Sequence, residues 1–210
     1  MNFMNVEQYQ FVKKQAKKIL SAYTSSKDQN VIQAIQALVQ EEINNKLYFS
    51  DVEQQLLLQP IFGLRTKEQL EIFIVDIKQY VEPFKRPTEN ELKKLFPKDE
   101  KLRIPNLEQI DWKEITYLSW VDSGTNRKYI VYREDGKLKG LRGVFSNTEK
   151  VGICTVCNRQ AKVGMLMTSK SGPTLGTYTK RGNYICEDSV ACNETLTDIS
   201  KLNDFVETLL

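Results

Sequence analysis

The sequence predicts an α+β protein in which a four-helix bundle is joined to an α/β domain. Three observations support this prediction. Apolar residues recur every three or four positions through the first eighty residues, which is the helical period, and they alternate after Asp111, which is the strand period. The four cysteines all lie in the last third of the chain. We expect a helical bundle domain over residues 1–86 and an α/β domain over residues 87–210.

Helix-capping residues mark the four amphipathic segments of the first domain. Asn5 can cap a helix that runs to about Tyr23, and a second helix is expected over 27–46. Capping boxes at 50–53 and 66–69 start a third helix, which should stop near Pro60, and a fourth, which Pro83 should end. Short amphipathic helices must bury their apolar faces against one another, so we predict a bundle. The second helix is expected to turn six residues inward: Val31, Ile32, Ile35, Leu38, Val39 and Ile43.

Prolines and charged residues mark the passage to the second domain, where Thr88 can cap one short helix. Strands are then expected over 114–121, 127–133 and 137–145, and Asp135-Gly136 between the last two predicts a hairpin. Aromatic residues on these strands could stack on the bases of single-stranded RNA, but core packing is the favoured interpretation. These aromatic residues are Tyr117, Trp120, Tyr129, Tyr132 and Phe145. The Gly-x-x-Gly of 140–143 indicates a bulge or a close backbone approach.

Composition excludes several classes of function. The 210 residues include no histidine, which excludes Ser-His-Asp and Cys-His catalysis and histidine-ligated zinc hydrolases. No Walker loop or dinucleotide-binding motif is present, and we expect a protein that is not an enzyme. No segment has the length and apolar character of a membrane helix or of a signal peptide, so we expect a cytoplasmic protein that does not bind membranes.

The net charge of +3 is unevenly distributed. Between Lys150 and Cys186 there are basic residues and no acidic residue, which favours an acidic partner surface or phosphates. A solvated face that simply lacks acidic residues is the alternative. The basic residues of this segment are Lys150, Arg159, Lys162, Lys170, Lys180 and Arg181.

The cysteines form two pairs, Cys154 with Cys157 and Cys186 with Cys192. The Cys-x-x-Cys spacing lets a tight turn direct two thiolates at one metal ion. Two expected strands, 161–168 and 177–185, lie between the pairs around a Ser-Gly-Pro-Thr-Leu-Gly loop, and such a hairpin would return the second pair to the first. We therefore predict one zinc ion per chain, bound by four cysteines in a module at about 150–195.

Three other uses of the cysteines stay open at the level of sequence. They could form disulfides, or Cys154 and Cys157 could form a redox Cys-x-x-Cys. A redox motif would leave the second pair unexplained. Catalytic zinc is the least favoured use, because four thiolates leave no coordination position for water.

The cysteines and their surroundings resemble the FusB/FusC-type family of elongation factor G-binding proteins. The resemblance rests on Ile153-Cys-Thr-Val-Cys-Asn, on Lys180-Arg-Gly-Asn-Tyr-Ile-Cys, and on Cys192-Asn with the following Thr-Asp-Ile. Upstream it includes Asn126-Arg-Lys-Tyr-Ile, Gly140-Leu-Arg-Gly and Ser146-Asn, and it reaches Val81-Glu-Pro-Phe. It covers the C-terminal half well and the N-terminal half mainly through the helix pattern and the length.

This resemblance implies a four-helix bundle followed by a domain with a treble-clef zinc finger. It also implies a protein that binds elongation factor G through the second domain, promotes its release from the ribosome, and so protects translation from fusidic acid. Tyr184, Arg181 and Lys180 would contact the partner, together with Ile153, which replaces an aromatic residue often found before the first cysteine. Arg181 stands where the family pattern has a lysine, and Asn183 where it has an acidic residue.

Two classes of function follow. The first is a monomeric protein-binding module that acts on elongation factor G, while that factor is bound to the ribosome. The second is a zinc-containing module that binds RNA or the ribosome through its basic residues; direct contact with nucleic acid is the less favoured of the two. Salt dependence separates them, because binding to phosphates weakens steeply with salt.

Overall fold

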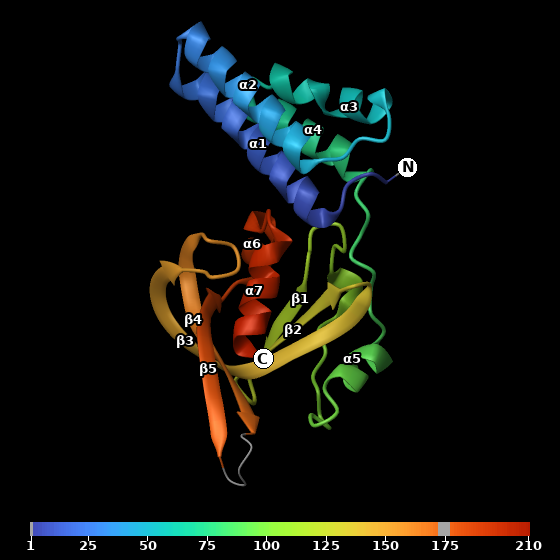
Figure 1. The fold of residues 1–210 in the computed structure, drawn as a ribbon, viewed down its shortest axis with the longest axis vertical. Helices are drawn as coiled ribbons and strands as arrows, with labels where there is room; N and C mark the ends of the chain where they lie inside the picture. Colours follow the sequence, from blue (N-terminus) through green and yellow to red (C-terminus); the bar gives the residue numbers. More distant parts are fainter. Residues whose placement is uncertain (1, 172–176) are drawn as a thin grey trace. The chain divides into compact units, whose positions relative to one another are not determined.

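The computed structural model describes residues 2–171 and 177–210 and is drawn in Figure 1. Contacts within the chain divide it into two compact units, Met1–Pro83 and Phe84–Leu210. Most of the loop that the sequence places between the last two strands lies outside the described residues.

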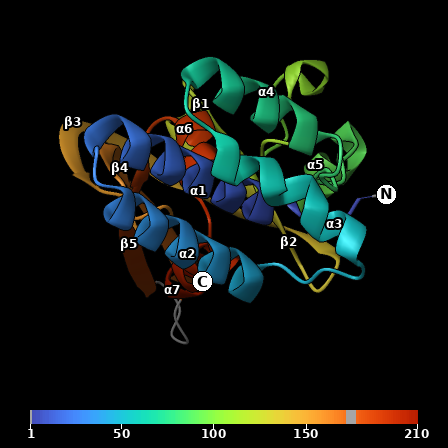
Figure 2. The same cartoon turned by 90° about the horizontal axis from the view of Figure 1, so that it is seen from above.

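The first unit is a bundle of helices in which α1 packs along α2 and α4 (Figure 2). Asn5 caps α1 through a capping box with Gln8, and Thr66 caps α4 in the same way with Gln69. Both caps were predicted. The α-helix α3 stops before Pro60, as expected, and continues as the 3₁₀ helix η1. The elements of the unit are α1 (Val6–Ser25), α2 (Gln29–Lys46), α3 (Val52–Leu58), η1 (Gln59–Gly63) and α4 (Lys67–Lys78).

Two expectations for α2 and α3 are wrong in detail. Val31 and Leu38 are 43% and 46% exposed rather than inward, because α2 packs mainly on α1 and a single neighbour covers only a narrow stripe of a helix. The cap of α3 is Asp51 rather than Ser50. The Asp51 carboxylate accepts a hydrogen bond from the Gln54 backbone, and the Gln54 side chain in turn accepts one from the Ser50 backbone.

The ends of the first unit meet. Helix α4 ends at Lys78 rather than at Pro83, and the chain beyond it runs beside the N-terminal segment. Met4 and Val81 form a parallel bridge, the Glu82 N–H donates to the Met4 carbonyl at 2.8 Å, and the Phe3 N–H donates to the Tyr80 carbonyl at 3.1 Å. Met4 and Val81 are both buried in the bundle core.

The second unit is built on an antiparallel sheet in which sequential strands are neighbours, in the order β1-β2-β3-β4-β5. Asp135 and Gly136 form the β2–β3 turn with φ of 50° and 73°, as their sequence predicted. The strands are β1 (Leu118–Asp122), β2 (Arg127–Glu134), β3 (Lys137–Ile153), β4 (Gln160–Ser171) and β5 (Tyr178–Cys186). The helices are α5 (Glu89–Leu95), η2 (Leu107–Gln109), α6 (Ser189–Thr195) and α7 (Ile199–Leu209).

Strand β2 separates two hydrophobic cores. Ile130 and Tyr132 face a core that includes α7 and the cysteines, whereas Tyr129 and Val131 face a core that includes α5. Tyr117, Tyr129, Tyr132 and Phe145 are all buried, and Trp120 is half-buried against the core that includes α5. These aromatic residues therefore fill the cores, as favoured, and do not form a base-stacking surface.

The boundaries of β1 and β3 differ most from those expected. Strand β1 starts at Leu118 rather than at Glu114, and β3 continues past Phe145 to Ile153 through a register shift between Asn147 and Lys150. This shift is the bulge of β3. Gly143 instead marks a close approach, since a Cβ there would lie 2.4 Å from the Met167 carbonyl oxygen.

Candidate metal centre

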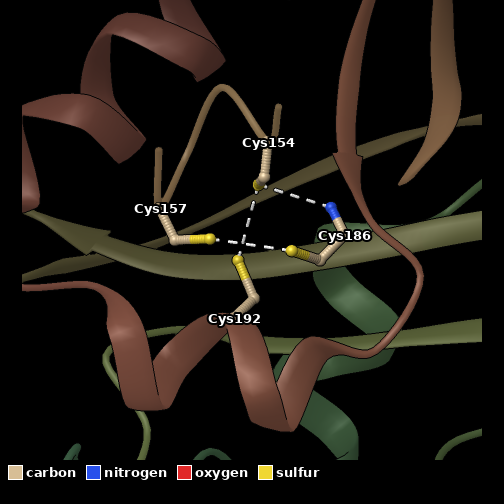
Figure 3. Close-up of side chains that lie close together, drawn as sticks. All are labelled: Cys154, Cys157, Cys186 and Cys192. Carbon is tan, nitrogen blue, oxygen red and sulfur yellow. Dashed lines mark hydrogen bonds between the residues drawn. The ribbon is translucent and has the colours of Figure 1, made fainter. Parts of the chain in front are cut away.

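The fold brings the two cysteine pairs together from three structural elements (Figure 3). Cys154 and Cys157 lie in the turn that follows β3, Cys186 is the last residue of β5, and Cys192 lies in α6. The four Sγ atoms all lie within 4.8 Å of one another. The β4–β5 hairpin therefore returns the second pair to the first, as the spacing predicted.

Backbone hydrogen bonds hold the turn after β3 against β5. The Asn158 N–H donates to the Cys154 carbonyl at 2.8 Å, and Asn158 has a positive φ of 54°. The Thr155 N–H donates to the Tyr184 carbonyl at 3.0 Å, and the Thr155 hydroxyl bonds to the Asn183 side chain at 2.7 Å. The turn is thus fixed to the strand that ends at Cys186.

The sulfur positions fit a tetrahedral zinc ion. Zinc–sulfur bonds of about 2.3 Å in a tetrahedron separate the sulfurs by about 3.8 Å. The Cys154 and Cys192 sulfurs are 3.8 Å apart, and those of Cys157 and Cys186 are 3.6 Å apart. Three of the cysteines are buried and Cys157 is half-buried, so four sulfur ligands would close the site to water. Such a site is structural rather than catalytic.

The thiols are also arranged so that a cation is needed to ionise all of them. Neighbouring thiols, that of Cys157 first, hold the pKa of Cys154 far below its ordinary value. The Cys154 sulfur in turn raises the pKa values of Cys186 and Cys192 well above theirs. Each thiolate therefore opposes the ionisation of its neighbours, unless a divalent cation offsets their mutual repulsion.

The other uses of the cysteines do not match this geometry. A disulfide needs sulfurs about 2.05 Å apart, and all four cysteines are free. A thioredoxin-like motif would place Cys154 and Cys157 at the start of a helix. They lie instead in a turn, and the second pair joins them in one cluster.

Two buried polar residues beside the cluster were not identified from the sequence. The Asn193 side chain is 1% exposed and hydrogen bonds to the backbone of Tyr117 and Ser189. Lys128 is completely buried, and its ammonium group donates to the Cys186 carbonyl. Burial lowers the pKa of Lys128, and the nearby sulfurs, that of Cys192 first, oppose this shift. The sequence did contain one indication of this burial: Lys128 alternates with Ile130 and Tyr132 along the expected strand, so it lies on the same face as these core residues.

The residues expected to contact a partner are all exposed, but they do not share one face. Strand β5 pairs with β4 without a register shift, so Tyr184 opposite Met165 and Arg181 opposite Thr168 lie on opposite faces of the sheet. Lys180 lies on the face of Tyr184. Tyr184 is 44% exposed, and Ile153, just before the cysteine turn, is 61% exposed.

Each of the two units contains a region that matches a known family model. Residues 3–85 match the family model described as elongation factor G-binding protein, N-terminal, and residues 96–207 match the one described as FBP C-terminal treble-clef zinc-finger. The chain belongs to this family. A solved structure described as that of the fusidic acid resistance protein FusC is similar to it with a TM-score of 0.90. Their sequences are 34% identical over 100% of this chain and 99% of FusC. A comparison with curated proteins gave no match.

The treble-clef match and the clustered sulfurs together indicate one bound zinc ion in this elongation factor G-binding family member. Cys154, Cys157, Cys186 and Cys192 would hold it, and the ion would supply a cross-link between the turn after β3, the end of β5 and α6. Within the described residues, none of the helices is both long enough and apolar enough to span a membrane.

Proposed function

We propose that this chain binds elongation factor G, promotes its release from the ribosome, and thereby protects translation from fusidic acid. The observation that carries the proposal is the structural similarity to FusC over the whole chain. The matches of the N-terminal and C-terminal regions to the two family models support it. We further propose that it acts in the cytoplasm as a monomer, on elongation factor G bound to the ribosome, and by binding rather than by catalysis.

We assign the contact to the domain over 87–210, with zinc held by its four cysteines as a structural cross-link. The outer face of β3, β4 and β5 supports this assignment. Val144, Met167 and Tyr184 lie on this face and are 48%, 39% and 44% exposed, and Val144 is the β-sheet partner of Met167. Exposed apolar residues with a rigid aromatic residue among them are typical of protein interfaces. Lys180 lies on the same face and would add charge at its rim.

The alternative is a module that binds RNA or the ribosome directly. The basic residues between Lys150 and Arg181 favour it, whereas the burial of Tyr117, Tyr129 and Phe145 removes the aromatic surface that base stacking would need. Because counterion release makes phosphate binding strongly salt-dependent, affinity measured at increasing salt separates the two functions.

The test follows elongation factor G held on ribosomes by fusidic acid. After the full-length chain is added, the ribosomes are pelleted and the factor in the supernatant is measured. We expect the chain to move the factor into the supernatant, and purified chain and factor to bind each other without ribosomes at moderately raised salt. Binding to ribosomes alone, with none to the factor, would contradict the proposal and favour the alternative.

A further inference from the structure

Lys128 is a charged residue in the core of the second unit, on the strand face that packs toward the cysteines. It is completely buried, and its neighbours on that face of β2 are the apolar Ile130 and the ring of Tyr132. An uncompensated ammonium group in such a place would strongly destabilise the fold. The groups around Lys128 Nζ therefore explain why a lysine is tolerated here.

Three oxygen atoms surround Lys128 Nζ. Two are backbone carbonyls at the end of β5, that of Cys186 at 3.2 Å and that of Glu187 at 3.4 Å, and the third is the Ser189 hydroxyl at 3.2 Å. An ammonium group has three N–H donors, so this arrangement uses all of them. The ring of Phe145 lies 4.8 Å from Nζ and adds a cation–π contact.

All three oxygens belong to the segment that joins two of the cysteines. Cys186 ends β5, Ser189 is the first residue of α6, and Cys192 follows one turn later. The segment between them sets the distance and direction of one sulfur relative to the other. A second set of contacts, from Asp188 to the N–H groups of Val190 and Ala191, caps α6 but does not reach across to the sheet.

Charge gives Lys128 a second effect on the same site. Four thiolates and one Zn²⁺ together carry an excess of two negative charges, which are costly to bury. Lys128 is a buried cation beside that excess, whereas the basic residues of 150–181 lie at the surface or only partly beneath it. A buried charge is screened far less by water than an exposed one.

We propose that Lys128 is a positioning residue of the zinc centre, which holds the Cys186–Ser189 segment in its metal-binding conformation and offsets the charge of the zinc–thiolate cluster. Residues that orient metal ligands without touching the metal typically change metal affinity by roughly 10–100-fold when they are replaced. No such role follows from the cysteine spacing.

The experiment measures how fast zinc passes from the full-length, zinc-loaded chain to a chromophoric chelator. We expect Lys128→Met to release zinc at least about tenfold faster than the unchanged chain, and Lys128→Arg, which keeps the charge and donors, to restore much of the difference. Ile130→Val is the matched control, since it weakens the same face of the same strand without touching the acceptors. Lys137→Met controls for the loss of one exposed positive charge.

Cobalt in place of zinc provides a readout of geometry, because its visible spectrum reports the ligand field. We expect the Lys128→Met spectrum to change and the Ile130→Val spectrum to stay the same. If Lys128→Met does not fold, Ser189→Ala removes one acceptor alone and should accelerate zinc release by a smaller factor. Release from Lys128→Met no faster than from Ile130→Val would overturn the proposal, as would a rate for Ser189→Ala equal to that of the unchanged chain.

Discussion

Asn193 and Tyr117 exchange two hydrogen bonds. The Tyr117 N–H donates to Asn193 Oδ1 at 3.2 Å, and Asn193 Nδ2 donates to the Tyr117 carbonyl at 3.0 Å. The same amide accepts from the Thr116 N–H at 2.7 Å and donates to the Ser189 carbonyl at 2.9 Å. A single buried side chain therefore joins α6 to the start of the sheet, directly after Cys192.

We expect Asn193→Asp to destabilise the second unit by about 2 kcal/mol or more, because a carboxylate oxygen would then face the Tyr117 and Ser189 carbonyls in place of the amide donor. Chemical denaturation of the zinc-saturated chain measures the effect. Asn44→Asp, at an exposed position of α2, adds the same charge and should change the unfolding free energy by less than about 0.5 kcal/mol. Equal unfolding midpoints for the two variants would show that the buried amide contributes nothing.

Removal of one sulfur should abolish the metal site. We expect Cys186→Ala to contain no stoichiometric zinc and to lose the folded structure of the zinc module, because apparent binding energies of about 10–16 kcal/mol couple such sites to folding. Metal analysis gives the zinc content, and circular dichroism should show that the helices of the first unit persist. Val190→Ala, at an exposed position between the last two cysteines, should keep its zinc. A Cys186→Ala chain with one tightly bound zinc would contradict the ligand assignment.

Acid should release zinc. Protons compete with the metal for the thiolates, so binding lowers the pKa values of the sulfurs that it holds, and the stability it adds is lost as the pH falls. In the metal-free cluster the neighbouring sulfurs, that of Cys154 first, raise the pKa values of Cys186 and Cys192, so the cluster takes up protons as zinc leaves. We expect the melting temperature of the second unit to fall between neutral pH and pH 5 with zinc present. With chelator present, the melting temperature should depend much less on pH. Identical pH profiles with zinc and with chelator would show that zinc binding and stability are not coupled.

Tyr184 should contact elongation factor G. We expect Tyr184→Ala to weaken binding by about 2–4 kcal/mol with little change in melting temperature, because a rigid half-exposed aromatic side chain is a typical interface anchor. Titration calorimetry on the full-length chain measures the affinity. Tyr48→Ala, at an 85% exposed position of the first unit, is the matched control and should bind normally. If Tyr184→Ala loses stability in step with affinity, the side chain serves packing instead.

The other contact candidates test which face of β5 is used. Since Arg181 and Tyr184 lie on opposite faces, a flat interface on the face of Tyr184 would include Lys180 and leave Arg181 at its margin. If the partner wraps around the edge of the strand, we expect Arg181→Ala and Ile153→Ala to weaken binding as well. We expect Lys180→Ala mainly to slow association, because Lys180 is a charge at the rim. Affinities unchanged in all three variants would confine the contact to the apolar residues around Tyr184.

Local signals in the sequence were sufficient for most of the elements. Capping residues such as Asn5 and Thr66, and the turn at Asp135-Gly136, act within a few residues and need no knowledge of the rest of the chain. The exposure of Val31 and Leu38 could not be predicted in this way. It depends on how many helices pack against α2, which is a property of the assembled bundle.

The same distinction holds at the metal centre. The spacing of the cysteines predicted the cluster, because a tight turn and a hairpin are local structures. Asn193 and Lys128 act on residues that are distant in the sequence, Tyr117 and Cys186, and only the folded sheet brings these pairs together. Alternation along the expected strand already separates Arg181 from Tyr184, unless the strand twists at Gly182. The register with β4 has no shift there, so the two side chains stay on opposite faces.

The bridge between Met4 and Val81 has a consequence for the order in which the chain can fold during synthesis. The N-terminal segment leaves the ribosome first, yet its backbone partners are Tyr80, Val81 and Glu82. At about 5–20 residues per second, they follow after about 4–15 s. Through that interval the buried face of α1 lacks part of its cover, so the first unit closes only when its own last residues have been made.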